Sequence, residues 1–316
     1  MTDDSFEVEP RSCSLDAHRV RLHYWDYGGQ GPVLILVHGL FDHARSWDRV
    51  ARVLRQAWHV HAIDLRGHGD GPWVAGAAYS LHEHVLDVAA LVQSVARGNP
   101  VRFLTHSLGS LVALRYAAAF PELVAALVAI EGISPPPSVQ ARPQAEAARL
   151  RDWILSVQRL EGQPPAVVES EADALNRLRR TNPALDAEWG CHLVRHGTNL
   201  APGGRLLWKH DPYLQARLTP VFDIDRDGEV YALVTCPVLV FQGRDSWGGD
   251  DVTRRLARVR RLQVIGVPGA GHWVHHDQPD LVAREAARFF GHSSPSPVHD
   301  AMAGVPAAPP ATKEKS

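Results

Sequence analysis

A serine lies where an apolar run gives way to a small-residue helix pattern, in "VRFLTHSLGSLVALRYAAAF" at residues 101–120. At a sharp turn from strand to helix, the Ser107 hydroxyl would project from the backbone and the amide of Leu108 would face a developing oxyanion. A second Ser-x-Gly begins at Ser246, but only Ser107 follows an apolar strand pattern and directly opens a long helix. The pattern predicts a nucleophilic serine, and its structural alternative is a helix-capping serine.

One histidine is placed by the sequence pattern to act as the base that a serine nucleophile requires. His272 lies in the glycine-rich stretch "VPGAGHWVHHDQP", just after the last predicted strand. Of the 18 histidines, it is the one that follows this strand with a glycine directly before it. We therefore expect His272 to be the base, whereas His275 and His276 fit the start of the next helix. The alternative is a structural histidine.

The stretch "LVHGLFDH" at residues 36–43 offers a second donor for an oxyanion. His38 and Gly39 close the first buried strand pattern, so that the amide of Leu40, alone or with that of Phe41, would face the same crevice as Ser107. Gly39 permits a close turn, and His38 is expected to order the loop by hydrogen bonding. The alternative is an ordinary turn at the end of a strand.

Strand and helix patterns alternate along the chain and would position these residues. Apolar strand patterns at 33–37, 58–65, 101–105 and 123–130 are separated by helical ones, which predicts a mostly parallel sheet of the α/β class. The alternation stops at 134–138 and restarts at 237–243. We expect a core formed by residues 15–133 and 235–291, an inserted helical cap at 134–234, and disordered tails at 1–14 and 292–316.

Four motifs in this order, "VHGL", "DLRGHGD", "THSLGS" and "GAGHWVHHDQP", resemble those of the α/β-hydrolase superfamily, in its cap-bearing branch with an "HG" oxyanion loop. The resemblance implies the α/β-hydrolase fold, with Ser107 as nucleophile, His272 as base, oxyanion amides from Leu40 and Leu108, and no cofactor. Relatives that open epoxides or remove halides carry aspartate at the elbow. Serine therefore points to ester-like acyl transfer.

Two positions depart from the family pattern. Thr105 stands where the elbow usually begins with glycine, and we expect it to be tolerated because a strand residue can be β-branched. The position of the usual triad aspartate holds Ser246, with Asp245 one residue early. Glu131 ends the preceding strand, as in a subclass of the dehalogenases, and is expected to orient His272 ahead of Asp245. The alternatives are a strand-end carboxylate for Glu131 and a turn residue for Asp245.

Composition excludes several other classes of function. The chain has 316 residues and a formal net charge of -2, which argues against a nucleic-acid partner. Cys13, Cys191 and Cys236 lie far apart, so neither a disulfide framework nor a thiolate zinc site is expected. Because no signal sequence or long apolar run is present, we expect a cytoplasmic protein without a membrane partner.

These observations predict a serine hydrolase that cleaves a small carboxylic ester or thioester through an acyl-enzyme on Ser107. The same residues would serve a carbon-carbon bond or lactone hydrolase. A non-catalytic protein that binds a ligand in the hydrolase fold is the alternative from another class. The expected partner is a small-molecule substrate, and the sequence does not indicate an oligomeric state.

Overall fold

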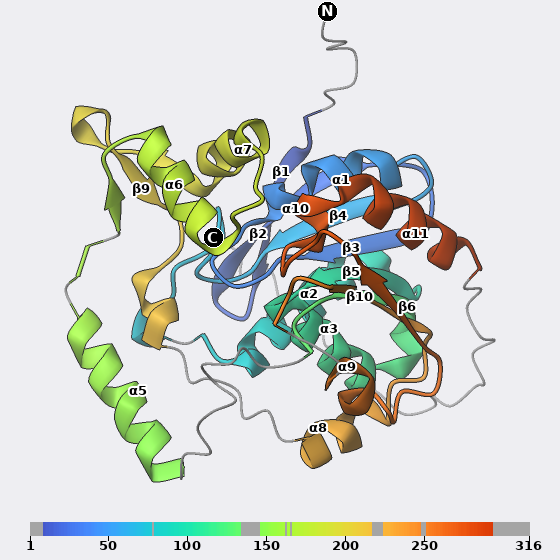
Figure 1. The fold of residues 1–316 in the computed structure, drawn as a ribbon. Coiled ribbons are helices and arrows are strands. Elements are labelled where there is room, and N and C mark those ends of the chain that lie inside the picture. The colour runs from blue at the N-terminus through green and yellow to red at the C-terminus, as the bar shows by residue number, and fades with distance from the viewer. Residues whose placement is uncertain are drawn as a thin grey trace, which may run out of the picture.

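The computed structural model describes residues 9–77, 79–133, 146–161, 163–164, 166–216, 224–247 and 251–292. Within them, eight strands form one sheet in the order β1-β2-β4-β3-β5-β6-β10-β11 (Figure 1). The first two pairings are antiparallel and the others are parallel, as the α/β class requires. The strands are β1 (Arg11–Ala17), β2 (Val20–Gly28), β3 (Val33–Val37), β4 (His59–Asp64), β5 (Val101–His106), β6 (Val124–Ile130), β10 (Val238–Gly243) and β11 (Leu262–Val267).

Helices cover both faces of this sheet and enclose two apolar cores. The helices α1 (Asp48–Leu54) and α11 (Pro279–His292) lie on one face, and α2 (Leu81–Ala96) and α3 (Leu108–Ala119) lie on the other (Figure 1). Every residue of β5 and β6 is buried, which explains why β6 is a continuous apolar run rather than an alternating one. The carboxyl ends of these central strands carry the predicted site.

The inserted cap contains the helices α5 (Glu146–Leu160), α6 (Glu171–Thr181) and α7 (Ala187–Gly197). It also holds a small antiparallel sheet of β7 (Val167–Val168), β9 (Leu206–Trp208) and β8 (Thr198–Leu200), which corrects the expectation of a purely helical cap. Strands of two or three residues are too short to show an alternating pattern. The short helices in and between the domains are η1 (Ala44–Trp47), η2 (Ala75–Ala77), η3 (Pro121–Leu123), η4 (Pro202–Gly204), η5 (Pro212–Ala216) and α10 (Val274–Asp277).

Two predicted boundaries differ from the structure. Residues 11–14, expected in a disordered tail, form the first part of β1, because an exposed edge strand needs only one apolar face and resembles a tail in composition. The helix α8 (Ile224–Tyr231) falls in the range predicted for the cap but packs against α3 and against α9 (Asp251–Arg255) of the core. Residues 1–8 and 293–316, and with them most of the predicted tails, lie outside the described residues.

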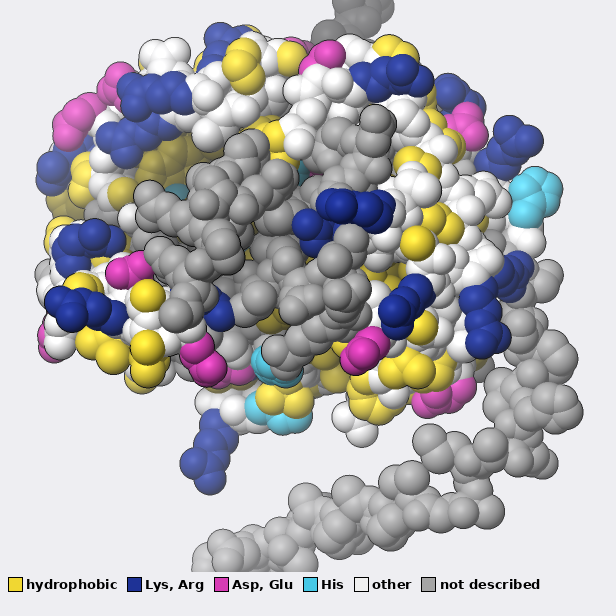
Figure 2. All heavy atoms as spheres, turned by 60° about the horizontal axis from the view of Figure 1, so that its bottom comes forward, with side chains coloured by type: hydrophobic (Ala, Val, Ile, Leu, Met, Phe, Trp, Pro, Cys, Tyr) yellow, Lys and Arg dark blue, Asp and Glu magenta, His cyan; other side chains and the backbone are white. Residues whose placement is uncertain are grey.

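The cap is held to the core by several polar contacts. Lys209 Nζ lies 2.6 Å from Asp70, and the Trp73 indole donates a hydrogen bond of 2.8 Å to the Lys209 carbonyl. On α7, the Leu193 carbonyl lies 3.0 Å from His43 Nε2 of the core. Figure 2 shows one face of the molecule, on which the described basic, acidic and apolar side chains are interspersed. None of the described helices is long and apolar enough to span a membrane.

Candidate active site

Ser107 occupies a strained turn between β5 and α3. Its backbone has φ 52° and ψ -114°, a left-handed conformation that side chains rarely adopt. The turn is closely packed: a Cβ at Gly132 would lie 2.2 Å from the Ser107 carbonyl oxygen, and one at Gly109 would lie 2.4 Å from the Val37 carbonyl oxygen. These two glycines allow neighbouring loops to hold the serine in place, as a nucleophile elbow requires.

Thr105, which replaces the usual glycine of the elbow, is fully buried without a clash. Its hydroxyl donates a hydrogen bond of 3.0 Å to the Val128 carbonyl of β6 and lies 3.2 Å from the Ser110 hydroxyl of α3. The threonine therefore sits as an ordinary strand residue with a satisfied hydroxyl, and it joins β5 to β6 and α3 beneath the elbow.

His272 follows β11 and reaches across to the serine. Its Nε2 lies 2.9 Å from Ser107 Oγ, which is hydrogen-bond distance. Two aromatic neighbours fix the loop: His106 Nε2 donates a 3.0 Å hydrogen bond to the His272 carbonyl, and the Trp247 ring stacks on the His272 ring at 4.1 Å. The nucleophile candidate and the base candidate thus meet in the geometry that proton transfer needs.

Glu131 provides the carboxylate nearest to the other ring nitrogen of His272. Its Oε2 lies 3.4 Å from His272 Nδ1, somewhat beyond hydrogen-bond distance, and the residue is 3% exposed. The Gly243 amide donates to Oε1 at 2.8 Å and the Ser246 hydroxyl donates to Oε2 at 2.9 Å. Like Ser107, Glu131 has a positive φ, of 56°. Two hydrogen bonds therefore hold the carboxylate beside His272.

Asp245, the second acid candidate, is exposed. Its backbone amide donates a hydrogen bond of 3.0 Å to the Ala270 carbonyl. Among the described residues, no hydrogen bond or ion pair joins Asp245 to His272. The structure thus brings Glu131, and not Asp245, to the Ser107–His272 pair.

The oxyanion candidates, Leu40 and Leu108, flank the serine on two sides. Leu108 is the first residue of α3, where amides have no partner within the helix. A Cβ at Gly39 would lie 3.2 Å from the Ser107 Cβ, so the loop that carries Leu40 passes directly against the nucleophile. His38 orders this loop as expected: its Nε2 accepts the Leu65 amide at 3.1 Å, and its Nδ1 donates to the Gly39 carbonyl at 2.6 Å.

The histidines packed around His272 add no positive charge to the site. His106 and His275 are buried, and their rings lie 4.5 Å apart beside the catalytic candidate. Burial lowers the pKa of both imidazoles well below the ordinary value, because the charged form would lose its hydration. The imidazolium that forms at His272 when Ser107 loses its proton is therefore not opposed by a positive charge on His106 or His275.

A cavity of about 180 Å³ lies between the oxyanion loop and the cap. Leu40 and Trp273, the neighbours of Gly39 and His272, form its inner wall. The cap contributes a mostly apolar lining that includes Leu178, Leu185, Leu193 and Trp208. Lys209 also lines it, but its charge is paired with Asp70. The cavity suits an apolar group of a substrate.

A second Ser-His-Asp chain occurs on the described surface. Ser12 Oγ lies 2.9 Å from His23 Nε2, and His23 Nδ1 lies 2.7 Å from the buried Asp64. Ser12 lies on the exposed edge strand β1 and not at the elbow. It carries no glycine-rich oxyanion loop of its own, yet it is a matched control for any reagent that labels activated serines.

Comparisons with known proteins place the fold and the family. A model of the alpha/beta hydrolase family matches residues 34–285. The chain belongs to this family. It is 33% identical over 192 residues to lipase LipV of Mycobacterium tuberculosis, covering 60% of this chain and 67% of that protein. It is 28% identical over 291 residues to the 2-(acetamidomethylene)succinate hydrolase of Mesorhizobium japonicum, covering 88% and 95%.

Solved structures of α/β-hydrolases share the architecture. The thioesterase domain from the curacin biosynthetic pathway superposes with a TM-score of 0.77 at 21% identity, covering 90% of this chain and 100% of that one. This likeness shows the fold. Together with relatives named as lipase and hydrolase, the family identifies the protein as a hydrolase.

Sequence patterns missed two residues that shape this α/β-hydrolase site. The sequence pattern gives Ser246 no role in the site, although its hydroxyl contacts the Glu131 carboxylate. Gly132 packs against the elbow from the loop after β6. A glycine directly after the candidate acid was the available signal.

Proposed function

We propose that this α/β-hydrolase is a serine hydrolase of small carboxylic esters or thioesters that acts through an acyl-enzyme on Ser107. The observation that carries the proposal is the 2.9 Å contact between Ser107 Oγ and His272 Nε2, with Glu131 at the other ring nitrogen. The relatives named as lipase and the structural neighbour named as thioesterase support the same bond class.

Ser107 Oγ attacks the substrate carbonyl carbon as its proton passes to His272 Nε2. The resulting oxyanion is stabilised by the amides of Leu40 and Leu108. Collapse of the intermediate breaks the bond to the alcohol or thiol, which leaves with the proton from His272. A water molecule, deprotonated by His272, then attacks the acyl-enzyme and releases the acid and Ser107. Glu131 holds the ring orientation and stabilises the imidazolium.

The apolar cavity favours a substrate with a hydrocarbon or aromatic acyl group over a small charged one. Carbon-carbon bond or lactone hydrolysis uses the same residues and is the alternative chemistry. Faster turnover of a vinylogous diketone than of simple esters would move the proposal to the carbon-carbon class. The cytoplasmic location remains a prediction from the sequence.

The test is intact mass spectrometry after exposure to a fluorophosphonate. We expect one adduct per chain in the wild type and in Ser12→Ala, and none in Ser107→Ala. An adduct that persists in Ser107→Ala and disappears in Ser12→Ala would assign the reactive serine to the edge strand instead. A folded wild type that binds ligand but neither reacts nor turns over esters would support a non-catalytic binding protein.

A further inference from the structure

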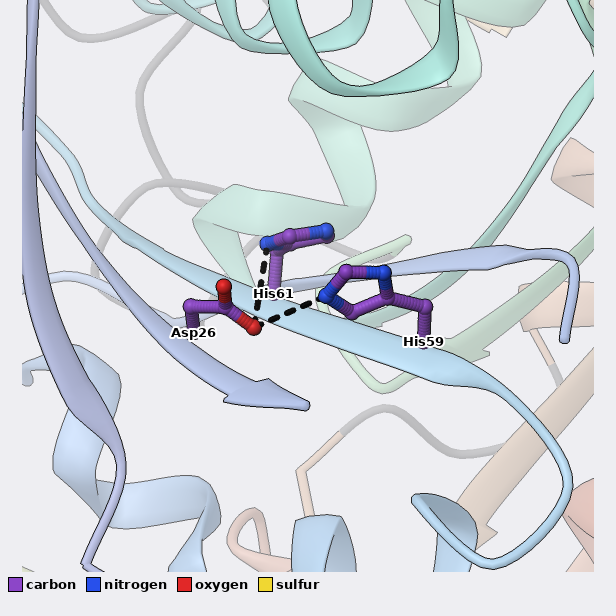
Figure 3. A group of neighbouring side chains, drawn as sticks. All are labelled: Asp26, His59 and His61. Atoms are coloured by element: carbon purple, nitrogen blue, oxygen red, sulfur yellow. Dashed lines mark hydrogen bonds and ion pairs between the residues drawn. The ribbon is translucent and has the colours of Figure 1, made fainter. Parts of the chain in front are cut away.

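Two histidines and one aspartate, from the neighbouring strands β2 and β4, converge on one another (Figure 3). His59 and His61 lie two residues apart on β4, so their side chains share one face of the strand. Asp26, on the antiparallel neighbour β2, pairs directly with His61. Since β4 begins at His59 whereas Ser107 follows the last residue of β5, this group lies at the amino ends of the parallel strands.

The three side chains aim their ligand-type atoms at one point. Asp26 Oδ1 lies 2.9 Å from His59 Nε2 and 3.9 Å from His61 Nδ1, and all three atoms are within 4.8 Å of one another. Ligand atoms of a tetrahedral zinc site, with bonds of about 2.0–2.1 Å, lie about 3.4 Å apart. The observed separations bracket that value, so small rotations of the side chains would bring all three onto one ion.

The burial of His61 without hydrogen-bond partners points to a ligand. The residue is 4% exposed, and neither of its ring nitrogens has a hydrogen-bond partner in the described structure. A buried polar atom without a partner is costly and therefore uncommon. An imidazole nitrogen without a hydrogen-bond partner can offer its lone pair to a metal ion. An ion at this point would satisfy Nδ1.

We propose that Asp26, His59 and His61 bind one divalent transition-metal ion, Zn²⁺ by ligand type, with water in the remaining position. Two imidazole nitrogens and one carboxylate oxygen form a ligand set that zinc accepts. The other contacts of Asp26 are compatible with this role. The Gly28 amide donates to Oδ1 at 2.8 Å and orients the carboxylate, while Arg11 pairs with Oδ2 at 2.8 Å. The second lone pair of Oδ1 is then the one that would bind the ion.

The site is open to solvent through its outer members. The side chain of His59 is 38% exposed and that of Arg11 is 76% exposed, so an ion can enter without unfolding of the strands. A bound ion would tie β2 to β4 and stabilise the antiparallel edge of the sheet, because a ligand that binds only the folded state raises its stability. Hydrolysis at Ser107 does not require it.

Titration calorimetry of the metal-free full chain with ZnCl₂ tests the proposal. We expect one strong site per chain, and an affinity lower by about tenfold or more in His59→Ala and in His61→Ala, because each loses a direct ligand. His82→Ala, which removes an exposed histidine of α2, is the matched control and should bind as the wild type does. Unchanged strong binding in both ligand variants would overturn the assignment.

If the substitution at the buried His61 prevents folding, the exposed-side variant His59→Ala alone serves as the test. Co²⁺ added to the metal-free wild type should give the absorption bands of a low-coordinate site, and these should be absent in His59→Ala. His192→Ala covers another candidate group, Asp48, His192 and His196, whose members are all partly buried. Loss of the bands in His192→Ala but not in His59→Ala, or no strong binding by the wild type, would reject the site.

Discussion

The carboxylate that faces His272 comes from β6, next to the strand that carries the nucleophile. Glu131 reaches the imidazole because a glutamate is one methylene longer than an aspartate and because the left-handed backbone at this residue turns its side chain toward β10. Hydrogen bonds from Gly243 and Ser246 of the β10 end fix the carboxylate there. This placement supports the proposal that Glu131 serves as the acid of the site in place of an aspartate after β10.

Replacing Glu131 by glutamine tests this role at the scale of one residue. The amide cannot stabilise the imidazolium that forms when Ser107 loses its proton, so we expect kcat for an activated ester to fall by about 10³–10⁴-fold. Asp245→Asn is the control and should retain the wild-type kcat, because that side chain is exposed and no hydrogen bond or ion pair joins it to His272 in the described structure. Equal losses in the two variants, or a larger loss in Asp245→Asn, would contradict the assignment.

A second prediction concerns Ser246, whose hydroxyl lies 2.9 Å from the Glu131 carboxylate. In the Glu131→Gln background, Ser246→Asp would return a negative charge close to the same point. We expect kcat to recover by roughly tenfold relative to the single variant, since the charge rather than the strand of origin stabilises the imidazolium. Steady-state kinetics would measure it. Ser246→Asn in the same background should restore nothing.

At the level of elements, the alternating strand and helix patterns predicted most of the sheet and its helices. The pattern "LHEHVLDVAALVQSVA" became α2, which begins at the capping box of Ser80 and Glu83. Sequence periodicity could not predict β1 or the cap sheet, because their pairing depends on distant partners and their strands are short or exposed. In the site, the motifs predicted Ser107 and His272, but only the fold could distinguish Glu131 from Asp245.

A prediction at the level of elements concerns the turn after β6. Gly132 has φ +80°, and a Cβ there would meet the Ser107 carbonyl oxygen at 2.2 Å, so alanine must displace the elbow. We expect Gly132→Ala to lower stability by about 3 kcal/mol or more and to abolish ester turnover. Gly98→Ala, with φ +85° and no atom near its Cβ, isolates the backbone effect and should cost only about 1–2 kcal/mol with activity kept.

Urea unfolding of both variants measures the difference. If Gly132→Ala were no less stable than Gly98→Ala, the close contact between the two loops would not constrain the elbow. Retained turnover in Gly132→Ala would carry the same meaning, because the nucleophile could then keep its position without the glycine.

At the scale of the whole molecule, several buried histidines lie where the cap meets the core. Burial lowers the pKa of His43 to about 4, of His210 to about 4 and of His276 to about 3, because the protein withholds the hydration that the charged form needs. All three line the cavity between the oxyanion loop and the cap. Protonation of these three imidazoles therefore makes the interface between the cap and the core sensitive to acid.

The stability of the protein should fall as the pH drops below the ordinary histidine pKa. Between pH 6.5 and about 4 the unfolded chain binds protons at these three histidines and the folded chain does not, so their contribution is complete above pH 6.5 and is lost below it. Burial raises the pKa of Asp42 to about 7, which acts in the opposite direction over the same range. For these four groups alone, three contributions of about 1.4 kcal/mol per pH unit against one leave about 3 kcal/mol per pH unit. Other buried histidines with lowered pKa values, such as His106 and His275, add to this loss.

Urea midpoints measured from pH 7.5 to pH 5 would show this loss, with His276→Asn as the matched variant. Removing one depressed histidine should flatten the slope below pH 6.5 by about 1.4 kcal/mol per unit, even if the substitution lowers stability at pH 7.5. Asp42→Asn should steepen the slope, because it removes the group that gains a proton on folding. A wild-type stability that is constant from pH 7.5 to pH 5 would mean that these imidazoles are hydrated, and that the cap and the core separate readily over the cavity.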